Sequence, residues 1–181
     1  MRLFIGIPLP TKVKRELSAI SSRLRSADDG LRWSSPESWH ITLQFLGNVE
    51  AEQYESVVLR LRDLRCRSIA VSFEGLSFLG NSVLIARVKP SPRLLELHQR
   101  VTKATESCGF ISEFRTYRPH VTLARGRERR SAILHRGVAG KWSLETRLAG
   151  FRAVEFLLYE SFLESSGSRY EIRERFPLRD I

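Results

Sequence analysis

Two short segments of this chain place a histidine and a threonine two residues apart. They are His40-Ile-Thr-Leu43 and His120-Val-Thr-Leu123. Alternate side chains of an extended strand point to the same face, so each His and its Thr would project together while the aliphatic residues pack in the core. An imidazole titrates near pH 6.5, so one of the two can donate a proton while the other accepts one. Threonine hydroxyls can hold phosphate oxygens. The segments therefore predict metal-independent displacement at a phosphodiester, with His40 and His120 as catalytic residues.

A structural role and a zinc site are the alternatives for these histidines. A lone histidine on a strand is more often a structural residue, and it is the repetition of the motif that favours chemistry. A zinc site would need a third ligand, usually a carboxylate or thiolate, and neither motif carries one. Cys66 and Cys108 form neither a metal-ligand set nor a disulfide framework. We expect no metal ion and no cofactor.

The elements that position the two motifs follow the same order in both halves of the chain. Pro8-Leu-Pro10 and Pro90-Ser-Pro92 each lie between a strand pattern and a helix pattern. His40 follows Pro10 by 30 residues, and His120 follows Pro92 by 28. A tetrapeptide that recurs in the same context is stronger support for a duplication than the tetrapeptide alone. We expect two lobes related by a pseudo-twofold axis, each supplying one histidine to a groove between them.

Hydrophobic periodicity predicts alternating helices and strands throughout the chain. The predicted helices cover residues 11–24, where Thr11 is placed to cap the start, 52–64 and 92–104. The predicted strands cover residues 3–7, 39–46, 69–73, 82–88, 120–123, 144–148, 153–162 and 170–176. No linker or low-complexity tract divides the 181 residues, so we expect one two-lobed domain over residues 1–181.

The composition is that of a soluble globular protein with a strongly basic surface. The chain carries 30 Lys and Arg residues against 20 Asp and Glu, a net charge of +10, and 25 of the 30 cations are arginines. Arginine presents a planar fork that matches phosphate oxygens, so RNA is the expected partner, although a compositional bias would also raise the arginine content. No apolar run is long enough to span a bilayer, and the first residues do not form a signal peptide. We therefore expect a cytoplasmic monomer without a membrane partner.

In its motifs and their order, the chain resembles the bacterial RNA 2′,3′-cyclic phosphodiesterases, historically named 2′-5′ RNA ligases, of the two-histidine phosphoesterase superfamily. The residues that carry the resemblance are Leu3-Phe-Ile-Gly-Ile-Pro-Leu-Pro10, His40-Ile-Thr-Leu-Gln-Phe-Leu-Gly47, Pro119-His-Val-Thr-Leu-Ala-Arg125, Ser161-Phe-Leu163, Tyr170 and Phe176-Pro-Leu178. The resemblance implies an α+β, bilobal, duplicated fold in which two antiparallel sheets flank a central groove and the helices lie outside.

The resemblance also implies an activity and roles for the motif residues. The reaction would be hydrolysis of a 2′,3′-cyclic phosphate at an RNA end, such as that of a tRNA fragment, to a 2′-phosphomonoester, with weak reverse 2′-5′ RNA ligation. His40 would be the general acid for the departing 3′ oxygen, and His120 the general base for water. Thr42 and Thr122 would hold the phosphate.

The strand faces on which Arg125 and Phe45 lie depend on how regular the two motif strands are. Arg125 lies five residues after His120, which strict alternation places on the opposite face. It can reach the groove only if the strand ends or bulges, which Gly126 makes feasible. The resemblance favours a phosphate contact for Arg125, whereas the alternative is one more solvated arginine beside Arg127, Arg129, Arg130 and Arg136. Phe45 falls on the aliphatic face of the first motif and is expected in the core.

Two rival functions remain open from the sequence. The first is a phosphodiesterase of the same superfamily that acts on a small cyclic nucleotide or an ADP-ribose cyclic phosphate. The second is a non-catalytic RNA-binding module that uses the same groove. The salt dependence of substrate binding separates the small-molecule enzyme from an RNA enzyme, because several phosphate contacts make RNA binding steeply salt-dependent. An assay for product separates the binding module from an enzyme, because the module would bind RNA without turnover. A pure binding module also does not require paired proton-transfer groups.

Overall fold

The computed structural model describes residues 1–25, 30–80, 82–111, 116–126, 148–164 and 167–179. Within these ranges the helices are α1 (Thr11–Leu24), α2 (Ala51–Arg62), α3 (Pro92–Glu106) and the short 3-10 helix η1 (Pro36–Ser38). The strands are β1 (Arg2–Pro8), β2 (Leu31–Trp33), β3 (His40–Asn48), β4 (Ile69–Val71), β5 (Phe73–Leu79), β6 (Val83–Val88), β7 (His120–Gly126), β8 (Phe151–Ala153), β9 (Glu155–Glu164) and β10 (Gly167–Pro177).

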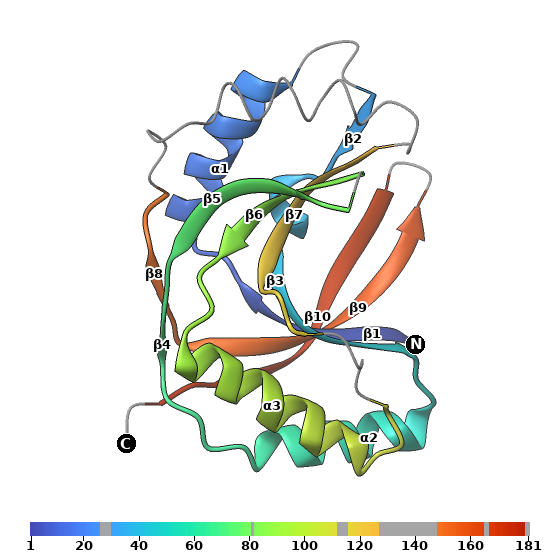
Figure 1. The fold of residues 1–181 in the computed structure, drawn as a ribbon. Helices are drawn as coiled ribbons and strands as arrows, with labels where there is room; N and C mark the ends of the chain where they lie inside the picture. Colours follow the sequence, from blue (N-terminus) through green and yellow to red (C-terminus); the bar gives the residue numbers. More distant parts are fainter. Residues whose placement is uncertain (26–29, 81, 112–115, 127–147, 165–166, 180–181) are drawn as a thin grey trace.

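Two four-stranded antiparallel sheets form the body of the protein (Figure 1). The first has the strand order β10-β9-β1-β3, and the second has the order β2-β7-β6-β5. A two-stranded ladder of β4 and β8 accompanies them. In each half, a strand is followed by a helix and later by an antiparallel partner strand: β1 pairs with β3, and β6 pairs with β7. This repeated arrangement confirms the predicted α+β class with two antiparallel sheets.

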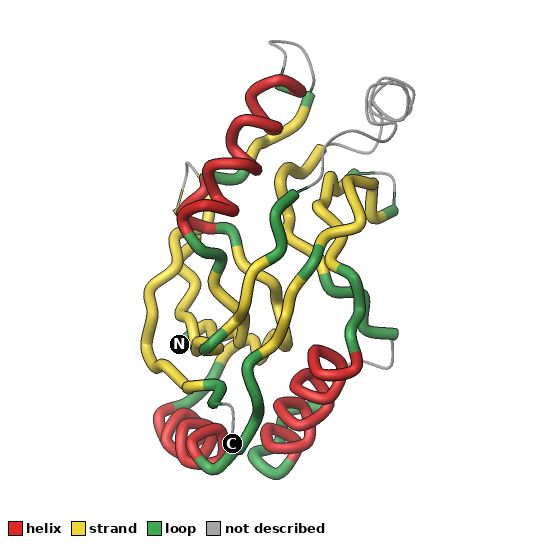
Figure 2. The backbone as a smooth tube through the Cα atoms, turned by 90° about the vertical axis from the view of Figure 1, so that its left-hand side faces the viewer, coloured by secondary structure: helices red, strands yellow, loops and turns green. Residues whose placement is uncertain are grey.

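The helices lie outside the sheets, at opposite ends of the molecule (Figure 2). α1 occupies one end and buries Val13, Leu17 and Ile20, which are spaced by three and four residues on one helical face. α2 and α3 pack together at the other end. Among the described residues, no helix has the length and apolar character needed to cross a bilayer.

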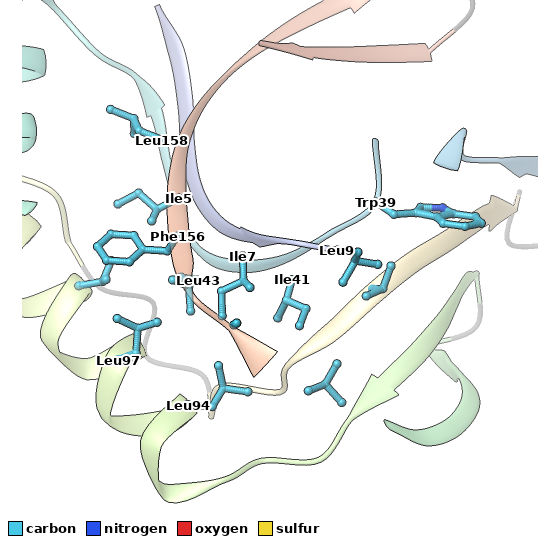
Figure 3. Close-up of a cluster of buried hydrophobic side chains, with 14 of the residues drawn as sticks. Ile5, Ile7, Leu9, Trp39, Ile41, Leu43, Leu94, Leu97, Phe156 and Leu158 are labelled. Carbon is cyan, nitrogen blue, oxygen red and sulfur yellow. The ribbon is translucent and has the colours of Figure 1, made fainter. Parts of the chain in front are cut away.

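The main core lies where α3 packs on the first sheet (Figure 3). Ile5 and Ile7 of β1 and Ile41 of β3 are fully buried. Leu94 and Leu97 of α3 are 1% exposed and close the core from the helix side. Ile41 and Val121, the residues that follow the two histidines, are both buried as the alternation predicted. The motif strands are therefore anchored in the core by their aliphatic faces.

Several predicted elements differ from the structure in detail. The Thr11 cap is wrong, because Pro10 is the N-cap of α1 and no side chain caps this helix end. The strand predicted over residues 69–73 is in fact two strands, β4 and the start of β5, which pair with different partners. The short strand β2 was not predicted, since its three residues are only half-buried or exposed. Most of the strand predicted over residues 144–148 lies outside the described residues.

Candidate active site

The two motif strands belong to different sheets. His40 is the first residue of β3, and His120 is the first residue of β7. The hydroxyl of Tyr117, just before β7, donates a hydrogen bond of 2.9 Å to the backbone carbonyl of Thr42. A cavity of about 710 Å³ is lined by both Thr42 and His120. The predicted groove between the lobes therefore receives residues from both motifs.

The two imidazoles are held by equivalent hydrogen bonds to the backbone. His40 Nδ1 lies 2.7 Å from the carbonyl oxygen of Ser38, and His120 Nδ1 lies 2.7 Å from the carbonyl oxygen of Arg118. Because a carbonyl can only accept, each Nδ1 carries the proton and each Nε2 is left for proton transfer. His40 Nε2 also lies 3.1 Å from the hydroxyl oxygen of Thr42. Both rings are thus fixed in orientation and tautomer by the backbone two residues earlier.

The structure shows a β-bulge at the same place in both motifs. Along β3 the partners of Ile5 and Gly6 are Gln44 and Thr42, so Leu43 is the extra residue. Along β7 the partners of Leu84 and Ile85 are Ala124 and Thr122, so Leu123 is the extra residue. A bulge inserts one residue into a strand and shifts the alternation of faces beyond it. The strand irregularity required for Arg125 is therefore present, and it precedes Arg125 rather than following it at Gly126.

The bulges place the fifth residue after each histidine on the exposed side. Arg125 lines a second cavity of about 400 Å³, together with Ser38 and Tyr170. Its counterpart Phe45 is 62% exposed and lines the 710 Å³ cavity. The prediction that Phe45 packs in the core is therefore wrong, because the bulge at Leu43 reverses the face that strict alternation assigned to it. The pseudo-symmetric groove is chemically unequal, with a cation at one end and a phenyl ring at the other.

His40 is enclosed by aromatic rings. Its ring centroid lies 4.5 Å from that of Phe4, 5.8 Å from that of Tyr159 and 5.3 Å from that of Tyr170, which meets it edge-on. The pKa of His40 is lowered from 6.5 to about 4, chiefly because burial disfavours the charged imidazolium. The hydrogen bond to the carbonyl of Ser38 acts in the opposite direction and raises this pKa, whereas the charges of His120, Lys14 and Arg125 contribute to lowering it. His40 is therefore neutral at pH 7 in the free groove. A phosphate anion bound beside it would favour the imidazolium, because an opposite charge raises the pKa of a base.

The lowered pKa of His40 predicts a loss of stability in mild acid. The unfolded chain takes up a proton on this imidazole near pH 6.5, whereas the folded chain takes it up only near pH 4. Between these values the unfolded state binds more protons, so the free energy of unfolding should fall as the pH drops through this window, by up to about 3 kcal/mol. Urea unfolding at pH 7 and pH 4.5 measures the effect, and the loss should be clearly smaller in His40→Gln. Equal losses in the two proteins would contradict the assignment.

Among the other predicted residues, the structure describes only Thr122. Thr122 follows His120 on β7 and is half-buried, opposite Ile85. Arg127, Arg129, Arg130 and Arg136 lie outside the described residues. Over the part of the chain that the structure describes, no three His, Cys, Asp or Glu side chains are grouped so that they could share a metal ion.

Sequence reasoning assigned no role in the groove to several residues that shape it. His98 of α3 stacks on Tyr117 with ring centroids 3.9 Å apart, and both line the larger cavity. Tyr170 of β10 lines the smaller cavity beside Arg125. Gly6 of β1 pairs with Thr42 and lies against the His40 ring. None of these residues belongs to a repeated pattern, so periodicity and spacing gave no signal for them.

The chain is similar in sequence to known phosphoesterases. A sequence model of the family described as LigT like Phosphoesterase matches residues 7–88. The chain is 27% identical to the RNA 2′,3′-cyclic phosphodiesterase of Methanocaldococcus jannaschii, over 95% of this chain and 98% of that protein. It is 28% identical to the protein of the same name from Geobacillus stearothermophilus, over 97% of this chain but only 56% of that longer protein. It is 25% identical to the Escherichia coli protein of this name, over 98% of this chain and 96% of that protein.

Solved structures share the fold. A crystal structure of a phosphoesterase superimposes with a TM-score of 0.81 at 22% identity, over 99% of this chain and 98% of that one. The Escherichia coli LigT complexed with 3′-AMP superimposes with a TM-score of 0.79 at 21% identity, over the same shares of the two chains. The sequence of this chain is thus similar to the LigT-like phosphoesterases over residues 7–88, and to proteins named RNA 2′,3′-cyclic phosphodiesterase over nearly its whole length.

Proposed function

We propose that this protein hydrolyses 2′,3′-cyclic phosphates at RNA ends to 2′-phosphomonoesters, and that it does so without a metal ion. The observation that carries the proposal is the pair of imidazoles with the same backbone anchor, each followed two residues later by a threonine. The names of the aligned relatives, and the 3′-AMP complex of the E. coli structure, support a nucleotide substrate.

In the proposed reaction, a water oxygen attacks phosphorus opposite the 3′ oxygen. His120 Nε2 takes the proton of the water as the new P–O bond forms. The 3′ P–O bond breaks, and the 3′ oxygen takes a proton from His40 Nε2, which leaves a 2′-phosphomonoester and a free 3′-hydroxyl. Thr42, Thr122 and Arg125 hold the phosphate oxygens. His40 gains the proton it must donate when the anionic substrate enters the groove and raises its pKa.

The same groups support a second outcome when RNA replaces water. If the 5′-hydroxyl of another RNA strand attacks the cyclic phosphate, the 3′ P–O bond breaks in the same way and a 2′-5′ phosphodiester forms. We propose this ligation as a weak side activity, since water is present at far higher concentration than RNA ends. Fragments of tRNA that end in a cyclic phosphate are suitable substrates for both outcomes.

Incubation with an oligonucleotide that ends in a 2′,3′-cyclic phosphate tests the proposed function. We expect a product with a terminal 2′-phosphate, identified by ³¹P NMR and mass spectrometry, and an unchanged rate in the presence of EDTA. A 3′-phosphate product would overturn the assignment of the leaving oxygen. Loss of activity in EDTA that is restored by added zinc would overturn the metal-independent mechanism, and binding without turnover would favour the RNA-binding module.

Replacing Arg125 should weaken substrate capture. Hydrogen bonds to charged groups contribute about 1.5–3 kcal/mol, so Arg125→Gln should lower kcat/KM by roughly tenfold or more. Because the Arg125 charge also lowers the pKa of His40, the same variant should raise that pKa in an NMR titration. Arg60→Gln, on the exposed side of α2, is the matched control and should change neither quantity. A normal kcat/KM in Arg125→Gln would remove Arg125 from the proposed site.

A further inference from the structure

A surface at the far end of the molecule gathers arginines that the proposed reaction does not use. Two adjoining cavities, of about 310 and 350 Å³, share Arg65 and Cys66 in their linings. We call the surface around them the basic end surface. Its seven arginines are all exposed: Arg62, Arg65, Arg67, Arg93, Arg100, Arg175 and Arg179. They come from the end of α2, the segment before β4, the start and middle of α3, and the end of β10 with the residues that follow it.

Only part of this charge is neutralised within the described residues. Arg62 pairs with Glu174 at 3.0 Å, Arg100 with Glu96 at 2.8 Å, and Arg175 with Glu155 at 2.7 Å. The other four arginines have no carboxylate partner in the part of the chain that the structure describes. Arg65 donates instead to the backbone carbonyl of Arg62, and Arg93 to that of Ser68, so both keep their full charge. The basic end surface therefore carries an excess of about four positive charges.

The basic end surface lies at the far ends of two elements whose near ends line the groove. On β10, Tyr170 lines the groove cavity beside Arg125, whereas Pro177 lines the basic end surface. Pro177 is seven positions after Tyr170 along the strand, a distance of about 23 Å. On α3, Thr102 lines the groove and Arg93 lines the basic end surface, about 14 Å apart along the helix. Arg100 is only two residues before Thr102, but helical geometry places it on the opposite face of α3. A cyclic phosphate in the groove cannot itself reach this surface.

We propose that the basic end surface binds the backbone of the RNA whose cyclic end occupies the groove. This inference rests on the proposed function and extends it from the RNA end to the RNA body. All seven cations are arginines, whose planar guanidinium groups can donate paired hydrogen bonds to two phosphate oxygens. At about 3.4 Å per nucleotide along a stacked strand, 23 Å corresponds to roughly seven nucleotides. The surface therefore selects RNA longer than about seven nucleotides and contributes nothing for a dinucleotide.

Kinetics with a long and a short substrate test the proposal. The patch variant is R65Q/R67Q/R179Q, and the charge-matched control is R2Q/R15Q/R23Q, which removes three exposed arginines from β1 and α1. With a 24-nucleotide RNA that ends in a 2′,3′-cyclic phosphate, we expect the patch variant to raise KM about tenfold at an unchanged kcat. The slope of log KM against log salt should fall by about two, because each single-strand phosphate contact contributes roughly 0.7. With a cyclic-phosphate dinucleotide, the patch variant should match the wild type.

Three results would overturn the proposal. The first is a KM for the long RNA that changes no more in the patch variant than in the control. The second is an equal change for the dinucleotide, which would place the effect in the groove. The third is lost binding to phosphatidylserine vesicles with an unchanged KM for RNA. Arg67 and Arg179 make no side-chain bond among the described residues, so R67Q/R179Q gives a smaller effect in the same direction without touching the Arg65 hydrogen bonds.

A failure of the proposed function is distinguishable from a failure of this inference. If the wild type does not turn over either substrate, the proposed function fails. Fluorescence anisotropy with the 24-nucleotide RNA then still measures the basic end surface, because binding does not require turnover. Weaker binding in the patch variant than in the control supports the inference in that case, and equal binding in the two variants overturns it.

Discussion

Replacing either His40 or His120 by alanine should lower kcat on cyclic-phosphate RNA by about 10²- to 10⁴-fold, the contribution typical of a positioned acid or base. Each imidazole is anchored through Nδ1 to a carbonyl at 2.7 Å, so alanine removes the Nε2 that transfers the proton and leaves the strand in place. The double variant should lose little more than the worse single variant, because the two groups act in one step. Single-turnover kinetics with excess enzyme measure the chemical step directly.

His98→Ala is the matched control for loss of an imidazole. The His98 ring stacks on Tyr117 at the groove wall and makes no carbonyl bond through its ring nitrogens among the described residues, so we expect kcat to change less than tenfold. Thermal unfolding of all three variants should show that they remain folded at the assay temperature. A loss in His98→Ala as large as in the other two would mean that imidazole loss disturbs the groove without a specific proton transfer.

The roles of the two histidines can be separated by the leaving group. A p-nitrophenolate leaves without protonation, so an enzyme that lacks its general acid should regain activity on a p-nitrophenyl phosphodiester relative to the cyclic phosphate. If His40 is the acid, His40→Ala should lose much less activity on the nitrophenyl ester than on cyclic-phosphate RNA, whereas His120→Ala should lose similar amounts on both. The opposite pattern would make His40 the general base and His120 the general acid. This reversed assignment is a real alternative because His40 is neutral in the free groove and could accept a proton.

The sequence predicted those parts of this fold that depend on short-range patterns. The repeated His-x-Thr-Leu placed His40 and His120 in strands predicted over residues 39–46 and 120–123, and the structure begins β3 at His40 and β7 at His120. The apolar spacing of Val13, Leu17 and Ile20 predicted α1 to its last residue. Patterns of period two or 3.6 are local, and the core residues that enforce them lie within a few positions of one another.

The parts that were not predicted depend on contacts between distant segments. The bulge at Leu43 is a property of the β1–β3 register, and it moves Phe45 from the expected core position to an exposed one. The basic end surface joins arginines from residues 62 to 179, which no sequence window brings together. The enclosure of His40 by Phe4, Tyr159 and Tyr170 joins three strands. Register and packing of this kind follow from the tertiary fold.

Gly6→Val should lower kcat by about a hundredfold while the substrate still binds. A Cβ at Gly6 would lie 3.0 Å from the carbonyl oxygen of Ile41 and 3.2 Å from Cδ2 of the His40 ring. The Ile41 oxygen is backbone in the sheet and cannot give way, so the larger valine must push the imidazole. A displacement of about 1 Å at a catalytic group can cost roughly 10² in rate. Gly6→Ala should give a smaller decrease in kcat. For both variants, kcat and KM are measured on the cyclic-phosphate oligonucleotide.

The control for Gly6 separates catalysis from stability. Gly150→Ala would place a Cβ 2.7 Å from the carbonyl oxygen of Val71, a tighter backbone contact in the β4–β8 region, away from both groove cavities. It should therefore lower Tm at least as much as Gly6→Ala yet leave kcat near normal. If both glycine variants lower Tm and kcat in parallel, Gly6 acts only through stability. If Gly6→Ala alone lowers kcat and also shifts the NMR titration of His40, then Gly6 is the residue that gives the imidazole its space.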